Sequence, residues 1–216
     1  MADGDKGQRL KLSAARNMVI EMMHHARKVP SIPVARICNL APLAAVRRQI
    51  PSAPSWTTLF IRGYGLVARR LPGLRQAYMP LPFPHIYQHP HSVCALVVER
   101  EWQGEAVLVA GRVREPEALS LKEIGERIRA LRETPVQEVA EFRQVLRLGR
   151  MPRIIRRLAL SYALYLGGGF RRAKRLGTFM VSSYGTLGAE QLHPLTPLTT
   201  LLTFGPISTE GEVNVK

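Results

Sequence analysis

The feature that most constrains the fold is a pair of strand-like segments separated by only three residues. Residues 92–101 and 105–113 are rich in valine, leucine and alanine, and Trp102, Gln103 and Gly104 connect them. A connection this short can only join antiparallel neighbours, so the two segments are predicted to form a β-hairpin. The chain therefore contains a sheet whose apolar side needs a covering layer.

A helix follows the hairpin directly. Residues 120–133 carry apolar side chains at helical spacing, Ser120 is placed to cap the first turn, and Glu123 completes a capping box three residues later. The proline-rich segment 78–91 must be extended or looped, because each proline removes a backbone donor. Further helices are expected at 14–28, 56–71, 136–149 and 151–166, and further strands at 32–40, 178–185, 198–205 and 212–216. This order predicts an α/β (α+β) fold with helices packed on a mixed, largely antiparallel sheet.

Length and composition are those of one ordinary globular domain spanning residues 1–216. The 216 residues are 46% hydrophobic and 22% charged, which is enough apolar material for one substantial core. The polar N-terminus predicts no secretory signal, and no apolar run approaches the ~20 residues of a membrane span. Cys38 and Cys94 lie far apart without metal or redox spacing, which favours a cytoplasmic location and core positions for both.

The charge balance is unusual. Thirty-one Lys and Arg face 16 Asp and Glu, a net charge of +15, and ten of the basic residues lie between Arg143 and Arg175 without any acidic residue. Such a surplus favours anionic partners. Residues 158–170 carry no charge and are bracketed by arginines, which fits a core helix with solvated basic ends, a helix at an anionic membrane surface, or a segment that binds the phosphates of a cofactor or an acidic partner. Nucleic acid is not expected, because aromatic residues are only 6% and no binding module is recognised.

The histidines do not form a convincing metal site. His85, His89 and His91 lie close together in a proline-rich segment without acidic or sulfur ligands nearby, so we predict a surface or channel-lining loop and no metal. A role for one of them as a catalytic base is a minor alternative. His24 and His25 lie near the end of a predicted helix, where an imidazole suits the helix dipole, and His193 follows a turn and is interpreted as structural.

Three segments resemble a known family when taken in order. KLSAARNMVIEMMHHARKVPSIPV (11–34) resembles the opening of the catalytic domain of dihydrolipoamide acyltransferases, the enzymes at the core of 2-oxo acid dehydrogenase complexes. The hairpin and helix from Val93 to Arg132 resemble that family's central strand pair and Ser-Leu-x-Glu-Ile helix. GTFMVSSYGTLGAEQLHPLTPLTTLLTFG (177–205) resembles its Gly-Thr-Phe-Thr-Ile-Ser-Asn-x-Gly block. The resemblance covers nearly the whole chain and implies the fold of chloramphenicol acetyltransferase.

The resemblance also implies a site. In the family, homotrimers hold active sites in channels between subunits, and a histidine acts as general base on the thiol of coenzyme A or dihydrolipoamide. Ser182 matches the family's oxyanion-stabilising serine, and Ser183 and Gly185 match positions next to the coenzyme, so coenzyme A is the expected acyl donor. Two departures are that Ser183 stands where the family has asparagine, and Leu176 stands where it has one of two paired glycines.

The largest departure is the catalytic histidine. The family continues through one more strand into a His-x-x-x-Asp-Gly motif, which does not occur in this sequence. We expect a domain that stops before that strand, either because the chain is truncated, which we favour, or because it is a degenerate copy. The expected function is acyl transfer between coenzyme A and a thiol, hydroxyl or amine acceptor, with the chain as given inactive. The alternative is a non-catalytic scaffold that binds a membrane surface, with peripheral contact through 143–175, or an acidic partner. No lipoyl domain precedes the matched segments, so a free-standing acyltransferase is favoured over an assembled dehydrogenase complex.

Overall fold

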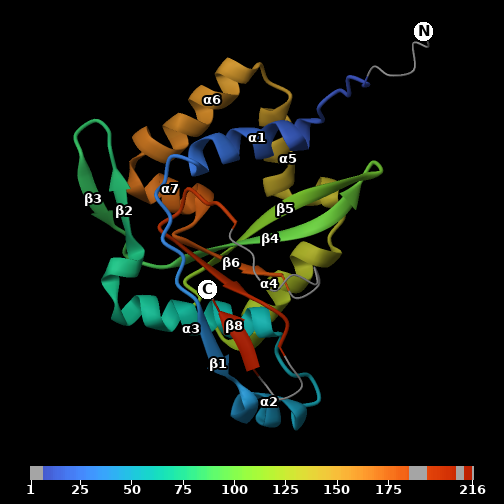
Figure 1. Cartoon of the computed structure of the whole chain (residues 1–216), viewed down its shortest axis with the longest axis vertical. Coiled ribbons are helices and arrows are strands. Elements are labelled where there is room, and N and C mark those ends of the chain that lie inside the picture. The colour runs from blue at the N-terminus through green and yellow to red at the C-terminus, as the bar shows by residue number, and fades with distance from the viewer. Residues whose placement is uncertain (1–6, 185–193, 208–211, 216) are drawn as a thin grey trace.

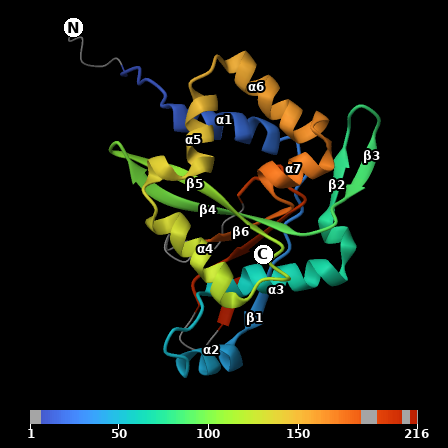
Figure 2. The same ribbon diagram turned by 180° about the vertical axis from the view of Figure 1, so that it is seen from behind.

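A six-stranded mixed sheet forms the centre of the molecule in the computed structural model, which describes residues 7–184, 194–207 and 212–215. The strand order is β1-β8-β7-β6-β4-β5. In Figure 1 the strands β4, β5 and β6 cross the middle of the picture, with α1, α5 and α6 drawn above them and α2 and α3 below. Figure 2 shows the same arrangement from behind, where α4 lies over the sheet.

The predicted hairpin is present. β4 (Val93–Trp102) pairs antiparallel with β5 (Glu105–Arg114) along its whole length, from Val93 opposite Arg114 to Trp102 opposite Glu105. Gln103 and Gly104 form the turn with φ angles of 54° and 73°. Two consecutive positive φ values are what a two-residue turn needs to match the twist of its strands, and Gly104 adopts such a value without strain.

The other strands extend the sheet from β4. β6 (Phe179–Ser183) runs parallel to β4 and to β7 (Thr200–Phe204), whereas β8 (Glu212–Val215) is antiparallel to β7 and to β1 (Arg36–Asn39). β1 is shorter than the predicted strand at 32–40. The parallel steps at β6 make the sheet mixed, as predicted, and they bring the carboxyl end of β6 beside that of β7.

Four helices cover one face of this sheet. α3 (Trp56–Arg70) and α4 (Leu121–Glu133) pack on a core that includes Val113, and α1 (Ala14–Ala26) and α5 (Ala140–Gly149) pack on Val107 and Val109. Successive side chains of a strand point to opposite faces, so these three valines of β5 share a face. All four helices therefore lie on that face. The fully buried Phe142 of α5 packs with Val107 and Val109 of β5.

The structure contains the capping box that the sequence predicted for α4. The Ser120 hydroxyl accepts from the backbone N–H of Glu123, and the Glu123 carboxylate accepts from the backbone N–H of Ser120 at 2.7 Å. These bonds satisfy donors that the first helical turn leaves free. The Glu123 pKa is lowered from its usual value mainly by the hydrogen bond from the Ser120 backbone. Ile124 and Ile128 then enter the core on the inner side of the helix.

Two helices were missed by the sequence analysis. α2 (Ala41–Arg48) has no buried side chain, so its short amphipathic pattern gave a weak signal. α7 (Gly168–Leu176) follows α6 (Arg153–Ser161) and a π-helical turn, η4 (Tyr162–Leu166), and begins in a run of three glycines just after the end of the helix predicted at 151–166. Gly168 has a φ of 73°, so the chain changes direction there and begins a new helix at once.

Two short 3₁₀ helices and one further hairpin lie between these elements. The 3₁₀ helices η2 (Pro72–Arg75) and η3 (Val136–Glu138) precede β2 (Gln76–Met79) and α5 respectively. β2 pairs antiparallel with β3 (His85–Gln88) in a separate two-stranded sheet. The proline-rich segment, for which an extended or looped conformation was predicted, is thus partly a projecting hairpin, visible at the edge of Figure 1.

Candidate functional site

Ser182, the predicted oxyanion donor, lies near the carboxyl end of β6. Pairing between β6 and β4 ends at Val181, whereas pairing with β7 continues and places Ser182 beside Thr203. Ser182 is therefore held on one side only, and its side chain is half-buried. Among the residues that the structure describes, no hydrogen bond to its hydroxyl is found, so the O–H is available to a ligand.

The face of the sheet on which Ser182 lies is the one that α1, α3, α4 and α5 leave uncovered. Phe179 and Val181 point into the core, so the alternate residues Met180 and Ser182 point away from it. On β5 the residues of this outer side include Leu108, which is half-exposed, and Ala110, which is exposed. We call this surface the open face, defined by Val97, Leu108, Ala110, Met180 and Ser182.

Of the two predicted coenzyme-binding positions, Ser183 and Gly185, the structure describes Ser183 alone. Ser183 is exposed, one residue beyond Ser182 on β6. Gly185 lies outside the described residues. Between them, Tyr184 is fully buried, and its backbone N–H donates to Phe204 O at 3.1 Å. That contact fixes the end of β6 against β7, so the Ser182 backbone occupies a defined position although the strand has nearly ended.

The chemistry open to Ser182 is that of a hydrogen-bond donor. A serine nucleophile needs a base that takes its proton, and no described histidine or carboxylate is hydrogen-bonded to Ser182. A hydroxyl can instead stabilise a negative charge that develops on a substrate oxygen. The arrangement therefore fits an oxyanion donor better than an activated nucleophile.

The histidines of the proline-rich segment do not converge. His85 is exposed and bonded through Nδ1 to Phe83 O at 2.8 Å, and His91 faces Glu115 at 3.9 Å on the surface. His89 is buried with its ring against Tyr87, and neither of its nitrogens has a hydrogen-bond partner within the described chain. Burial first, then the charges of nearby arginines, lowers the pKa of His89 to about 4. Within the described ranges no group of three His, Cys, Asp or Glu side chains is arranged to hold a metal ion.

A cluster that the sequence analysis did not identify joins α1 to α6. Glu21 is fully buried, Arg157 Nε donates to its Oε2 at 3.0 Å, and Arg153 and Arg156 lie at 3.8 Å from Oε1. One turn further along α1, His25 is buried and shares a 3.2 Å hydrogen bond with the Tyr165 hydroxyl. Burial lowers the pKa of His25, with His24 and Lys28 adding to the effect.

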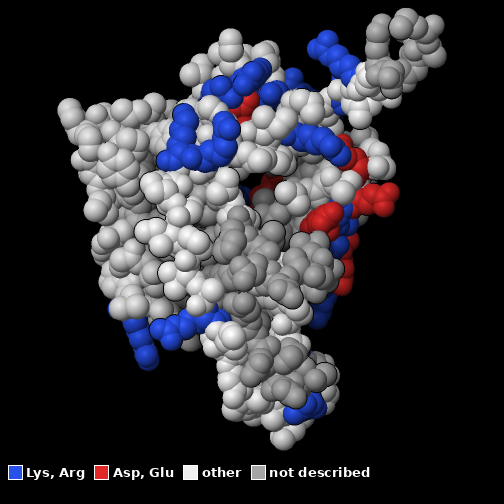
Figure 3. Space-filling model, viewed as in Figure 1, with Lys and Arg blue, Asp and Glu red and all other residues white. Residues whose placement is uncertain are grey.

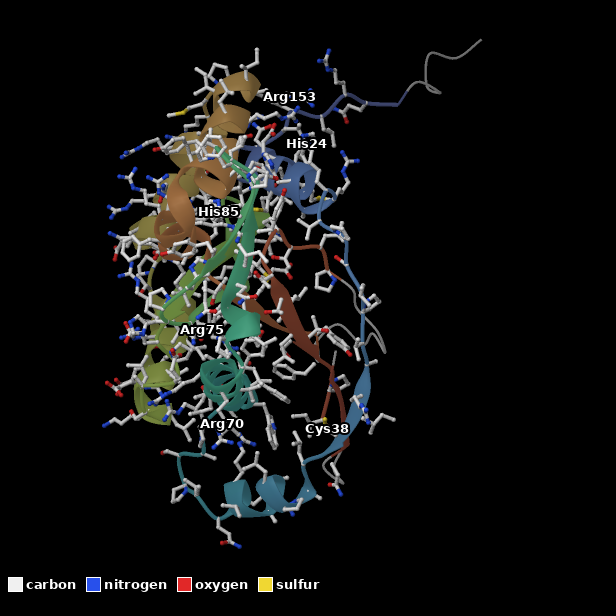
Figure 4. All side chains as sticks on the ribbon, turned by 90° about the vertical axis from the view of Figure 1, so that its left-hand side faces the viewer. His24, Cys38, Arg70, Arg75, His85 and Arg153 are labelled. Atoms are coloured by element: carbon white, nitrogen blue, oxygen red, sulfur yellow. The ribbon has the colours of Figure 1, made fainter. Side chains whose placement is uncertain are left out.

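The position of this cluster can be followed in Figure 4, where Arg153 and His24 lie in the same part of the molecule and Cys38 of β1 lies at the other end. A signal for it was present in the sequence: Met18, Glu21 and His25 fall on the inner side of the first helix, with an acidic residue between apolar ones. An acid on the inner side of a helix needs basic partners from a neighbouring element. The sequence alone did not reveal which element supplies them.

One hollow of the described structure lies away from Ser182. It measures about 260 Å³ and lies between α4, α5 and β5, bounded by Leu131, Val139 and the ion pair of Arg112 with Glu141 at 2.8 Å. Its wall contains no serine and no histidine. Cys94 is fully buried as predicted, which raises the pKa of its thiol, and Cys38 is half-buried; both are free thiols. Neither the hollow nor the cysteines form a second catalytic arrangement.

Comparison with known proteins identifies the fold. No protein-family model matches the chain, and no curated protein matches its sequence. Solved structures do match. A probable dihydrolipoamide acetyltransferase from Listeria monocytogenes has a TM-score of 0.64 at 15% identity, and the match covers 99% of this chain and 85% of that one.

Two further structures agree with this. The dihydrolipoamide acetyltransferase of Azotobacter vinelandii has a TM-score of 0.69 at 12% identity, covering 99% of this chain and 83% of that one. A truncated catalytic core of the 2-oxoacid dehydrogenase multienzyme complex from Thermoplasma acidophilum has a TM-score of 0.63 at 12% identity, covering 97% and 87%. This chain has the fold of these catalytic cores, which confirms the predicted fold class and the recognition of the acyltransferase fold in the sequence.

Proposed function

We propose that this chain is an acyltransferase domain that moves an acyl group between coenzyme A and a thiol, hydroxyl or amine acceptor. One observation carries the proposal: in a fold shared with dihydrolipoamide acetyltransferase cores, Ser182 presents on the open face, at the end of β6, a hydroxyl to which no described residue is hydrogen-bonded. In the Azotobacter vinelandii relative, a serine, a histidine and an asparagine were investigated for their role in the catalytic mechanism. Ser182 is our candidate for the corresponding serine.

The proposed reaction is attack on a thioester. A base removes the proton from the acceptor, whose lone pair attacks the carbonyl carbon of the acyl-coenzyme A. The carbonyl oxygen gains the negative charge, and Ser182 donates a hydrogen bond to it; donors placed in this way contribute about 3–4 kcal/mol to lowering the barrier. Collapse of the intermediate breaks the carbon–sulfur bond and expels the coenzyme thiolate, which takes up the proton from the base.

The base is the component that the described residues do not supply at Ser182. We propose that it reaches the site across the open face from a second subunit, in a homotrimer. Partly exposed apolar side chains on the open face, including Leu108 and Met180, support a contact of this kind, because burying them between subunits is favourable. The Thermoplasma acidophilum relative is the core of a multienzyme complex, which fits an assembled state.

Coenzyme A is the proposed acyl donor. Its phosphates suit a chain with a net charge of +15, and Ser183 is exposed beside Ser182, where its hydroxyl can contact the coenzyme. Gly185 is proposed as the second coenzyme-binding position. We place the activity in the cytoplasm, which fits the free thiols of Cys38 and Cys94.

The test compares Ser182→Ala with a matched control. Acyl transfer from acetyl-coenzyme A to a pool of thiol, hydroxyl and amine acceptors is followed in the full-length protein by release of the coenzyme thiol. We expect Ser182→Ala to lower kcat about 10²–10³-fold with little change in KM, because the hydrogen bond forms only as charge develops. Ser52→Ala, a change at an exposed serine, should leave the rate unchanged. An unaltered kcat in Ser182→Ala removes Ser182 from the mechanism.

A second candidate is a non-catalytic scaffold that keeps the acyltransferase fold and docks on a membrane. The observation that favours it is a row of apolar side chains left in solvent on α6 and its continuation. A full-length protein that binds vesicles but transfers no acyl group, with Ser182 and Ser182→Ala indistinguishable, would establish this candidate and overturn the first.

A further inference from the structure

The segment from α6 to the start of α7 exposes an unusual row of apolar side chains. Five of them recur at intervals of four residues and are between 43% and 74% exposed: Ile154, Leu158, Tyr162, Leu166 and Phe170. We call this row the α6 stripe. Leu160 and Leu164 on the other side of the same segment are buried, so the segment is packed on the protein through one side and presents a second apolar side to solvent.

From Ile154 to Leu166 the local backbone keeps the row on one side. In an α-helix, side chains four residues apart are neighbours, but each step drifts slightly around the axis. At Tyr162–Leu166 the helix becomes a π turn, in which Gly167 N donates to Tyr162 O at 2.6 Å across five residues. The wider turn rotates less per residue and returns Leu166 towards the row, and π turns of this kind are found frequently at functional sites.

Basic side chains border the α6 stripe. Arg153 stands at its start, and Arg171, Lys174 and Arg175 stand at its end, all exposed. Glu21, the carboxylate that faces α6, is fully buried and already surrounded by Arg153, Arg156 and Arg157. Figure 3 shows basic atoms gathered over the part of the molecule that α1 and α6 form, while acidic atoms lie towards the end of the β4–β5 hairpin. The stripe is thus apolar in its middle and positive at both ends.

The apolar middle and basic ends of the α6 stripe favour an anionic lipid surface over a second copy of the chain as its partner. A second copy in a twofold contact would place the same face against itself, so the arginines of one chain would meet those of the other with no acidic residue between 143 and 175 to offset them. An anionic lipid surface has no such conflict. Isoleucine, leucine and phenylalanine enter the outer acyl region, while arginine and lysine reach phosphates at the headgroups.

We propose that the α6 stripe docks this protein on the surface of an anionic membrane. The proposal specifies the lipid contact of the scaffold candidate, but it does not depend on whether Ser182 supports acyl transfer. From Ile154 to Leu166 the stripe extends about 18 Å at 1.5 Å per residue, too short to cross a bilayer and suited to lie along it. In agreement, no helix within the described residues is long and apolar enough to span a membrane.

The experiment measures binding of the whole chain to vesicles by flotation. Vesicles of phosphatidylcholine mixed with phosphatidylserine are compared with phosphatidylcholine alone, at about 0.1 M and about 1 M salt, where screening lengths are about 10 Å and 3 Å. We expect binding to the anionic vesicles only, and a strong loss at high salt. Lys174→Gln with Arg175→Gln should weaken binding roughly 25-fold, because each basic side chain near an anionic surface contributes a factor of about five.

Matched triple variants test the apolar part. Ile154→Ser, Leu158→Ser and Phe170→Ser together should weaken anionic-vesicle binding roughly 1,000-fold, since inserted side chains of this size each contribute about tenfold. Leu66→Ser, Val67→Ser and Leu71→Ser remove three exposed apolar residues at the end of α3 and should leave binding unchanged. Far-UV circular dichroism shows whether both variants keep the fold.

Three results would overturn the proposal. They are the absence of vesicle binding, equal binding to both lipid compositions, and equal loss in the α6 and α3 variants. A change of oligomeric state in the α6 variant without vesicles, seen by analytical ultracentrifugation, would instead assign the stripe to a contact between copies. Because flotation requires no acyl donor, its outcome is separate from the Ser182 experiment.

Discussion

Replacing Gly149 by alanine tests a close contact between α1 and α5. Gly149 is the last residue of α5, where α5 meets the first residue of α1. A Cβ atom at Gly149 would lie 2.0 Å from Ala14 O and 2.7 Å from Ala14 C. Since real Cβ contacts essentially never fall below 3.0 Å, the two backbones must separate by about 1 Å.

The expected loss of unfolding free energy follows from the contacts that this separation of α1 and α5 disturbs. Overpacking in a well-packed core costs about 1–3 kcal/mol. The Gly149 carbonyl also accepts hydrogen bonds from Asn17 Nδ2 and Arg156 Nη1, each at 3.2 Å, and their weakening adds to the cost. Alanine recovers less than about 1 kcal/mol of helix propensity at a terminal position. We expect Gly149→Ala to lower the free energy of unfolding by about 2–4 kcal/mol.

The assay is urea unfolding followed by far-UV circular dichroism. With a slope of about 2–3 kcal/mol per M urea, the midpoint should fall by about 1 M. Gly63→Ala is the matched control: Gly63 lies inside α3, and a Cβ there meets no atom within 4 Å. That change should raise stability by about 0.5–1 kcal/mol through helix propensity. Equal midpoints for Gly149→Ala and the parent chain would refute the close approach of α1 and α5.

The remaining predictions concern buried polar groups and the core. Glu21→Gln should lower the free energy of unfolding by about 3–5 kcal/mol in urea melts, because Arg156 would stay buried without a countercharge; no change would show that solvent reaches this cluster. Phe142→Ala removes a fully buried ring that packs edge-on against Trp102 at 5.5 Å, so a loss of about 3–5 kcal/mol and a shift in tryptophan emission are expected. Burial, then Arg172, lowers the pKa of His89 to about 4, so the unfolded chain binds the proton more tightly and stability is lost as pH falls from about 6.5 to 4, by at most about 1.4 kcal/mol per pH unit. Urea midpoints across this range should fall less in His89→Leu than in the parent chain, and identical profiles would contradict the assignment.

Local patterns predicted the elements whose signals are local. The β4–β5 hairpin was predictable because a three-residue connection leaves one pairing geometry, and α4 because Ser120 and Glu123 satisfy backbone donors within one turn. α7 was missed because a run of glycines usually ends a helix, whereas here the positive φ of Gly168 redirects the chain into a new one. Whether such a turn ends or restarts a helix depends on what the next residues can pack against.

The candidate site was likewise predictable only in part from the sequence. The resemblance around residues 177–205 indicated Ser182, and it also indicated the strand that carries it. The side to which Ser182 points could not be read from that segment, because FMVSS is apolar on one side and mixed on the other, and either side could face a layer of helices. β6 pairs in parallel with β4, a strand far away in the sequence, and this pairing places Leu96 beside Val181. The pairing decides that Val181 enters the core and Ser182 faces out.

By itself the sequence determined the β4–β5 hairpin and the cap of α4, since these depend on periodicity and on neighbouring residues, and its resemblance to a known family indicated the acyltransferase fold and Ser182 as the candidate site residue. Only the tertiary structure decided that Glu21 is enclosed by three arginines of α6, and that Ile154, Leu158 and Phe170 remain in solvent. An apolar residue on a helix indicates that burying it is favourable, but it does not indicate which surface will bury it. That choice is made by residues distant in the chain, when helices and strands compete for the same apolar area.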